Sequence, residues 1–381
     1  MDEAFAKPRT KSLLEHFAAI QDSRQPCKIM YPLPEVLLLV VCATIASCDD
    51  YAEIVAWGEA HLVFLRRFQP YHWGVPCEDW LRVVMNRIDP ALFAACFTAW
   101  VAERRPDAVD LVAIDGKTSR RSYDRSTGKK ALHLVSAWAT TERMVLGQEA
   151  VDETSNEITA IPLLLDRLAL QGALVTIDAI ACNPTIAAAI RQAGADYLLA
   201  VKDNQPSLRS EMARYFDTAP AAEIETHTQV EKGHGRLETR RHVVSTTVDW
   251  MAGSRHYPGE PRFPDRTTLG MVERTVEKAG EISCERRYYI CSAALDVARF
   301  ADAVRTHWTI ENQLHWVLDV QFKEDQSRLR AGHGATNMAV VRHFAINLVR
   351  TARDSRSIKT RRKLAGWDTG YLYALIQPAP N

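Results

Sequence analysis

The sequence predicts an α/β protein with a mixed-sheet core, a β-rich insertion and an all-α region before the core. Residues 1 to about 105 show helical periodicity with no strand-like alternation. From about 109 to 216, short apolar runs alternate with helical stretches, as in a sheet covered by helices on both faces. Helical periodicity then disappears between about 221 and 294 and returns near 297.

The N-terminal region contains clear helix start signals. Ser12 and Glu15 fit a capping box, and Pro34 opens an apolar helix. The apolar run at 36–48 is too short to span a bilayer, so we expect a buried core helix and no membrane partner. The break Arg104-Arg105-Pro106-Asp107 predicts a boundary between a helical domain at 1–105 and a catalytic domain at 106–381.

The second domain is expected to hold several strands and helices in alternation. Strands are predicted at 109–114, 132–138, 144–151, 173–177 and 197–201, with helices at 156–170, 184–193 and 207–216. The insertion at 221–294 is expected to contain strands at 243–248, 267–275 and 286–292. A helix at 297–320 and a basic helical C-terminal region at 335–381 complete the predicted domain.

Composition restricts the class of protein. The eight cysteines form no Cys-x-x-Cys pair, which disfavours a zinc site or disulfide framework and fits a reducing cytoplasm. The 47 basic and 47 acidic residues give no net charge, which counts mildly against nucleic-acid binding. The basic residues are nevertheless unevenly distributed along the chain.

Two aspartates occupy equivalent places in the predicted sheet. Asp115 and Asp178 each follow an apolar strand directly. Ligand sites gather at the carboxyl ends of strands in open α/β sheets, which favours a shared site. Either aspartate can also cap a turn or helix, and that alternative stays open.

Glu311 stands out on the predicted helix at 297–320. At 100° per residue it falls in a largely apolar stripe with Leu314 and Leu318, so we expect it to be buried. A buried carboxylate needs a cation, either Arg305 in an ion pair or a divalent metal shared with the two aspartates.

Two residues that follow Glu311 on the same predicted helix, His315 and Asp319, are candidates for supporting the acidic site. Asp319 either extends the acidic site or faces solvent. His315 either orients Glu311 or packs beside Trp316, and packing is the expectation. Three carboxylates suit oxygen-preferring Mg²⁺, and two such ions support phosphoryl transfer.

Five ordered motifs resemble one family. They are 114–121 (IDGKTSRR), 176–179 (TIDA), 199–206 (LAVKDNQP), 233–240 (GHGRLETR) and 307–319 (HWTIENQLHWVLD). Over nearly its whole length the chain resembles bacterial insertion-sequence transposases of the DDE type, in the H-repeat-associated subgroup. The resemblance implies a ribonuclease-H-like core and a helical N-terminal domain that accompanies it. It also implies that Asp115, Asp178 and Glu311 are catalytic and bind Mg²⁺, for which Mn²⁺ substitutes.

The same resemblance implies a DNA-processing function. The expected partners are terminal inverted repeats and a target duplex, bound by a homodimer or larger assembly. The chain departs from related transposases in having His307 four residues before the glutamate and Leu318 seven residues after it. The phosphate contacts made by Arg and Lys in those relatives therefore do not carry over.

Basic residues near the motifs are candidate DNA contacts. Lys117, Arg120 and Arg121 follow the first aspartate, where a phosphate backbone would lie. Arg236 and Arg240 form a second group, and the run at 342–363 is either a third group or a solvated face.

A separate polar group ends the strand at 197–201. Lys202, Asn204 and Gln205 either hold DNA or form a turn ended by Pro206, in which Asn204 satisfies backbone groups.

The sequence thus predicts a transposase that hydrolyses phosphodiesters at element ends and transfers the freed strand to target DNA. Two alternatives stay open. One is a nuclease of the same fold that cuts without joining, and the other is a transposase-derived DNA-binding protein that has lost catalysis.

Overall fold

The computed structural model describes residues 12–105, 109–152, 155–233, 235–252 and 262–377. The predicted boundary at Pro106 and Asp107 falls outside these residues. Over the described chain, no helix is long and apolar enough to cross a membrane. All eight cysteines are free.

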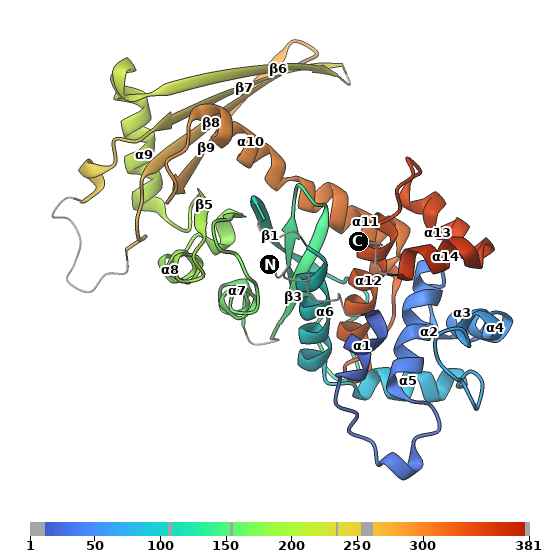
Figure 1. Cartoon of the computed structure of the whole chain (residues 1–381). Helices are drawn as coiled ribbons and strands as arrows, with labels where there is room; N and C mark the ends of the chain where they lie inside the picture. The colour runs from blue at the N-terminus through green and yellow to red at the C-terminus, as the bar shows by residue number, and fades with distance from the viewer. Residues whose placement is uncertain (1–11, 106–108, 153–154, 234, 253–261, 378–381) are drawn as a thin grey trace, which may run out of the picture.

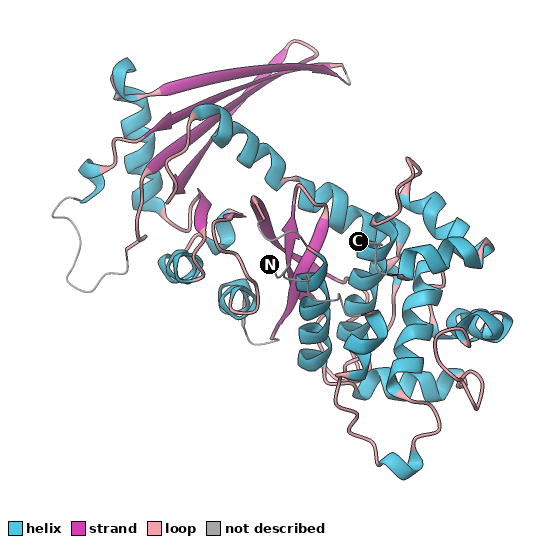
Figure 2. Cartoon of the chain, viewed as in Figure 1, coloured by secondary structure: helices cyan, strands magenta, loops and turns pink. Residues whose placement is uncertain are grey.

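A nine-stranded mixed sheet runs through the molecule in the order β3-β2-β1-β4-β5-β9-β8-β7-β6 (Figures 1 and 2). Its first part contains β1 (Leu111–Thr118), β2 (His133–Ala139), β3 (Met144–Val151), β4 (Leu174–Ile177) and β5 (Asp196–Val201). β1, β4 and β5 are parallel neighbours, whereas β2 and β3 are antiparallel. This arrangement confirms the predicted mixed α/β class.

Four long strands extend the sheet beyond β5. They are β6 (Glu225–Gly233), β7 (Arg236–Ser245), β8 (Thr268–Lys278) and β9 (Glu281–Cys291), all antiparallel. We call them the β6–β9 extension, and they confirm the predicted β-rich insertion. The sequence located only the last part of β7 and missed β6. Both faces of their outer ends are exposed, so these segments carry little apolar alternation.

Helices cover both faces of the sheet. α7 (Glu157–Leu165) and α8 (Pro184–Gln192) pack on β2, β3 and β5. α10 (Val297–His307) packs on the opposite face, where Phe300 and Val304 join a cluster with Leu111, Leu174 and Leu198. α9 (Pro206–Thr218) contacts β9 of the extension, where Phe216 stacks on Tyr288.

The N-terminal and C-terminal helices form one helical body, seen beside the sheet in Figure 1. Its helices are α1 (Leu13–Ala18), α2 (Leu33–Ile45), α3 (Tyr51–Ala60), α4 (Leu62–Leu65), α5 (Glu78–Arg87), α6 (Pro90–Arg104), α12 (Gly334–Arg350), α13 (Ile358–Trp367) and α14 (Thr369–Ile376). The Phe344 ring of α12 contacts the rings of Phe17, Phe97 and Trp100. The predicted capping box is present, because Ser12 caps α1 and Glu15 bonds back to it.

Helix α12 also ties this body to the sheet. The Asn347 side chain accepts a hydrogen bond from the Val145 N–H at 2.9 Å and donates one to its carbonyl at 2.9 Å. It thereby satisfies backbone hydrogen-bonding groups on β3, which is an edge strand of the sheet. Arg342 and Arg362 of the basic run at 342–363 are both buried, whereas Arg353, Arg356, Lys359 and Lys363 are exposed, so about half of the run is the solvated face considered from the sequence.

Candidate active site

The register of two parallel strands brings the predicted aspartates together. Ile114 pairs with Ile177, so Asp115 and Asp178 are the next residues on neighbouring strands. Leu111 and Leu174, four residues earlier on each strand, face the α10 side of the sheet. Since side chains alternate along a strand, both aspartates face that side as well.

Glu311 reaches the same place from the other direction. It lies on the π-helix η5 (Ile310–His315), which follows α10 and precedes α11 (Trp316–Gln321). Asp115, Asp178 and Glu311 together line one cavity. The structure therefore brings together the three carboxylates that the sequence singled out.

The burial of the three carboxylates differs from the expectation. The Glu311 side chain is 57% exposed, whereas that of Asp115 is 27% exposed. The sequence argument assumed one regular helix over 297–320. Instead α10 ends at His307, and the Trp316 N–H bonds to the Glu311 carbonyl five residues back. This π turn shifts the helical phase, so the prediction of a buried Glu311 was wrong.

Asp115 is the carboxyl group of this site whose pKa is most clearly raised. Burial raises its pKa to about 7, and the charges of Glu157, Glu311 and Asp178 push in the same direction. A hydrogen bond from the Gly116 backbone opposes this rise. A buried acid surrounded by other acids is the environment that a divalent cation relieves.

Asp178 is held by its own loop. Its carboxylate accepts a hydrogen bond from the Ala179 N–H, and it lies 3.4 Å from the Lys202 ammonium. The Asn204 amide donates to the Ala179 carbonyl at 2.6 Å, and Gln205 donates to the Cys182 carbonyl at 3.1 Å. These contacts match the turn interpretation of Asn204 and Gln205, in which the two amides support the loop after the aspartate.

His315 completes the cluster around Asp115. Its Nδ1 lies 3.0 Å from a Glu311 oxygen and 3.5 Å from an Asp115 oxygen. One donor atom from each of these three residues falls within 4.8 Å of the others. Burial lowers the His315 pKa, so its imidazole is neutral and able to bind a metal. The expectation that His315 only packs beside Trp316 was wrong.

A second histidine borders the same cavity. His307 is partly buried, and its Nδ1 lies 2.9 Å from the Thr176 hydroxyl. Burial lowers its pKa to about 4, so it is uncharged near neutral pH. A neutral imidazole therefore occupies the position where related transposases have an arginine.

Lys117 and Asp319 belong to a separate cluster. The Lys117 ammonium lies 2.6 Å from Asp319, 2.9 Å from Glu324 and 3.6 Å from Asp325. Only 10% of its side chain is exposed. Such a lysine is already neutralised and is unsuited to a DNA phosphate, so we no longer assign it to DNA. Asp319 neither extends the acidic site nor faces solvent freely.

The remaining basic candidates differ in their surroundings. Arg120 and Arg121 are exposed after β1, and Arg120 lies 3.3 Å from Asp325. Arg236 is 46% exposed and lies 3.4 Å from the buried Glu238. Arg240 pairs with both Glu231 and Glu238, and it lines a cavity on the β6–β9 extension.

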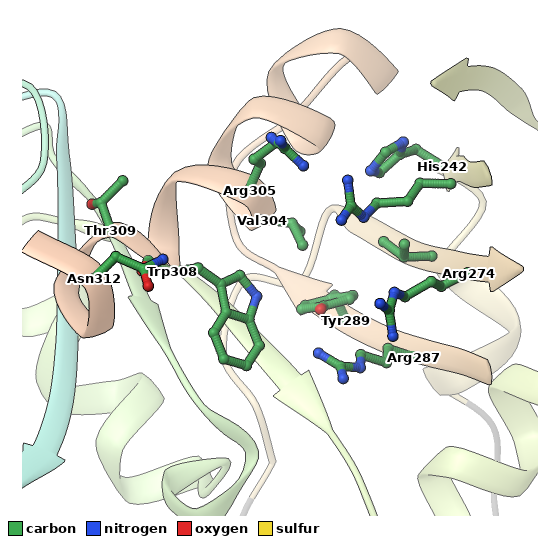
Figure 3. Close-up of a pocket in the computed structure, with 11 residues that line it drawn as sticks. His242, Arg274, Arg287, Tyr289, Val304, Arg305, Trp308, Thr309 and Asn312 are labelled. Atoms are coloured by element: carbon green, nitrogen blue, oxygen red, sulfur yellow. The ribbon is translucent and has the colours of Figure 1, made fainter. Parts of the chain in front are cut away.

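This cavity, which we call the arginine cavity, lies between α10 and strands β7–β9 (Figure 3). It has a volume of about 550 Å³. Figure 3 shows Arg274, Arg287 and Arg305 pointing into it beside Tyr289 and Trp308. The Arg287 guanidinium lies 5.5 Å from the centre of the Trp308 ring, which is half exposed.

The arginine cavity continues into the carboxylate cavity. Arg287, Tyr289, Val304 and Trp308 line both. The sequence analysis missed Arg274, Arg287 and Trp308 as candidates. The alternation of Arg287 with Tyr289 along a strand gave a signal, but the sequence does not show that α10 packs across β8 and β9 to close the cavity.

Comparison with known proteins agrees with this geometry. A family described as "DDE_Tnp_1-associated" matches residues 14–101, and the "Transposase DDE domain" family matches residues 104–348. The chain is 36% identical over 371 residues to the "H repeat-associated putative transposase YhhI" of Escherichia coli (strain K12), covering 96% of this chain and 98% of that protein.

Two further relatives also match most of the chain. The "Putative transposase YncI" of Escherichia coli O157:H7 is 37% identical, covering 96% of this chain and 94% of that protein. The "Uncharacterized protein in dhlA 3'region" of Xanthobacter autotrophicus is 39% identical, covering 74% and 94% respectively. The chain therefore belongs to the DDE transposases of bacterial insertion sequences, in their H-repeat-associated group, and its sheet forms the ribonuclease-H-like core of that family.

Proposed function

We propose that this protein is a Mg²⁺-dependent transposase that hydrolyses phosphodiester bonds at element ends and joins the freed strand to target DNA. The observation that carries the proposal is the meeting of Asp115, Asp178 and Glu311 in one cavity around an acid of raised pKa. Carboxylate oxygens are the donors that Mg²⁺ and Mn²⁺ prefer, so the residues fit such an ion.

The chain's own groups have distinct roles in this proposal. Asp115, Asp178 and Glu311 would hold the metal, which when bound supplies an activated water or 3′-hydroxyl and stabilises charge on the leaving oxygen. Strand β1 fixes Asp115, which pairs with Ser136 of β2, while Asp178 follows the end of β4 and the loop contacts of Asn204 and Gln205 keep it in place. Lys202 is 54% exposed beside Asp178 and is the nearest candidate for a contact with the scissile phosphate.

The arginine cavity supports a path for the DNA strand. It adjoins the carboxylates and offers guanidinium groups for phosphates together with the Trp308 ring for stacking. Its arginines are partly neutralised, because Arg305 lies 2.6 Å from Glu231 and Arg287 lies 2.8 Å from Glu285. We assign Arg240 to this path together with these residues. We assign Arg120, Arg121 and Arg236 to contacts with DNA outside the cavity.

The proposal extends to partners. The substrates are the terminal inverted repeats and a target duplex, and the DNA complex contains two or more copies of this chain. The protein acts in the cytoplasm, where bacterial DNA is found.

The test uses a labelled duplex that carries the repeats flanking the gene, together with a target duplex. The full-length protein is expected to cleave the end and join it to the target with Mg²⁺ or Mn²⁺. Asp115→Asn, Asp178→Asn and Glu311→Gln should remove both steps while binding persists. Asp203→Asn is the matched control, since Asp203 is 91% exposed beside the site.

Three other outcomes contradict the proposal. Cleavage without joining would identify a nuclease. Specific binding by the wild type with no cleavage in any metal would identify a DNA-binding derivative that has lost catalysis. Activity in the Asp115→Asn variant would remove the assignment of the triad.

A further inference from the structure

His315 lies at the centre of the acidic cluster. Its side chain is buried, yet its Nδ1 lies 3.0 Å from Glu311 Oε2 and 3.5 Å from Asp115 Oδ2. The two carboxylates come from different elements, η5 and β1. One nitrogen therefore lies close to two carboxylates that are about 200 positions apart in the sequence.

A single proton on Nδ1 does not account for both contacts. It would satisfy Glu311 at 3.0 Å and leave Asp115 at 3.5 Å, the outer limit of a hydrogen bond. The other ring nitrogen, Nε2, is buried without a hydrogen-bond partner among the described residues. Orientation of Glu311 alone therefore leaves the Asp115 carboxylate, whose side chain is 27% exposed, without a good hydrogen bond from the imidazole.

The same distances suit two edges of a metal coordination shell. Ligands about 2.1 Å from an octahedral ion stand about 3.0 Å apart. At the same bond length around a tetrahedral ion they stand about 3.4 Å apart. The 3.0 Å separation from Glu311 equals the octahedral edge, and the 3.5 Å separation from Asp115 is close to the tetrahedral edge, so a small movement of Asp115 brings both acids into one shell with Nδ1. Asp178 lies outside this close group and lines the cavity separately.

We propose that Nδ1 of His315 is a direct ligand of the divalent metal that Asp115 and Glu311 hold. This inference rests on the metal-dependent function proposed above and adds a nitrogen to its oxygen ligands. Mg²⁺ is bound through oxygen, whereas imidazole suits transition metals. His315 thus shifts the preference of the site from Mg²⁺ toward transition metals such as Mn²⁺.

The test is spin-echo modulation spectroscopy of Mn²⁺ bound to the full-length protein. A directly coordinated imidazole gives a ¹⁴N coupling, which changes when the protein is grown with ¹⁵N-histidine. We expect this coupling in the wild type, its loss in His315→Gln, and its retention in His307→Gln. His307 is the matched control, because it lines the same cavity but bonds to Thr176.

Affinity provides a second readout. His315→Gln should weaken Mn²⁺ binding by about 10- to 100-fold or more, because replacing a residue that only hydrogen-bonds to a metal ligand already has an effect of this size. Mg²⁺ binding should fall less. The ¹⁵N experiment needs no variant, so a folding defect in His315→Gln does not block the test.

The outcomes separate this inference from the proposed function. Bound Mn²⁺ without nitrogen coupling, or coupling that is lost only in His307→Gln, would overturn the role of His315 and leave metal dependence intact. Absence of Mn²⁺ binding, with and without end DNA, would overturn both.

Discussion

Two acidic clusters begin two residues apart on strand β1, and they differ in what neutralises them. Around Asp115, the strongest neighbouring charges are negative, and the pKa of Asp115 rises to about 7. Around Lys117, three carboxylates surround one ammonium, and Lys117 and Arg342 hold the pKa of the buried Glu324 below its usual value. Among the described residues, no basic side chain forms an ion pair with Asp115 except the neutral His315, whereas the second cluster contains its own ammonium.

This difference separates a site from a structural support. The Lys117 cluster is complete within the chain and joins β1 to α11, α12 and the short helix Glu324–Gln326. The Asp115 cluster has the surroundings that a divalent cation would relieve, and we propose that it binds one. Counting acids along the sequence does not distinguish the two, whereas their neutralising partners do.

The largest expected effect on stability comes from removing the internal cation. Lys117→Met leaves the buried Glu324 and the partly exposed Asp319 without their ammonium, and breaking a buried pair such as Lys117–Glu324 costs about 3–5 kcal/mol. Urea denaturation measures this loss. Lys129→Met is the control on the same segment, because Lys129 bonds only to backbone carbonyls in the described structure. An equal loss in both variants would break the comparison.

The two clusters should respond to pH with opposite signs when metal is absent. The pKa of Asp115 is raised on folding, so its contribution is full at low pH and is lost as pH rises toward about 7. Relative to Asp115→Asn, the wild type should lose up to about 1.4 kcal/mol per pH unit across this window.

Glu324 should show the reverse behaviour. Its pKa is lowered on folding, so it stabilises the protein above its ordinary pKa and loses this contribution as pH falls. Denaturation curves of Asp115→Asn and Glu324→Gln in EDTA, compared with wild type, measure both signs. The same sign in both would show that the clusters are electrostatically alike.

A smaller effect is expected at the loop after Asp178. Asn204→Ala removes the amide that bonds to the Ala179 and Cys182 carbonyls, which should cost about 1–3 kcal/mol. Cleavage should fall with DNA affinity unchanged. A selective loss of DNA affinity in a gel-shift assay would return Asn204 to the DNA contacts.

The smallest expected effect concerns the arginine cavity. Arg287→Ala should weaken DNA binding and reduce the slope of log affinity against log salt by about one. Binding isotherms at several salt concentrations give this slope. Arg299→Ala is the control, since Arg299 lies on α10 and pairs with Asp110. An unchanged slope for Arg287→Ala would remove the cavity from the DNA path.

The sequence predicted the apolar strand segments before the two aspartates because each depends on local pattern, but β1 continues to Thr118 and so contains Asp115, which was expected to follow the strand. Asp115 and Asp178 follow apolar runs, and the parallel register then places them side by side. The helical stripe singled out Glu311, through an expectation of burial that was wrong, and the resemblance to transposases connected it with the two aspartates. The three candidate metal-binding carboxylates were therefore available before the structure.

What the sequence could not give depends on distant partners or on local irregularity. Lys117 was misassigned because its carboxylates lie about 200 residues away. Glu311 was expected to be buried because no pattern indicated the π turn. The role of His315 and the arginine cavity both required knowing which elements pack together.

The most direct test of metal binding at the Asp115 cluster is the unfolding free energy measured with Mn²⁺ and with EDTA at pH 8. An ion that binds only the folded chain should stabilise the wild type by about 2.7 kcal/mol at 100 times its Kd. We predict this gain in the wild type and in Asp203→Asn, and its loss in Asp115→Asn. No gain in the wild type, or an equal gain in Asp115→Asn, would contradict the assignment of this cluster as the metal site.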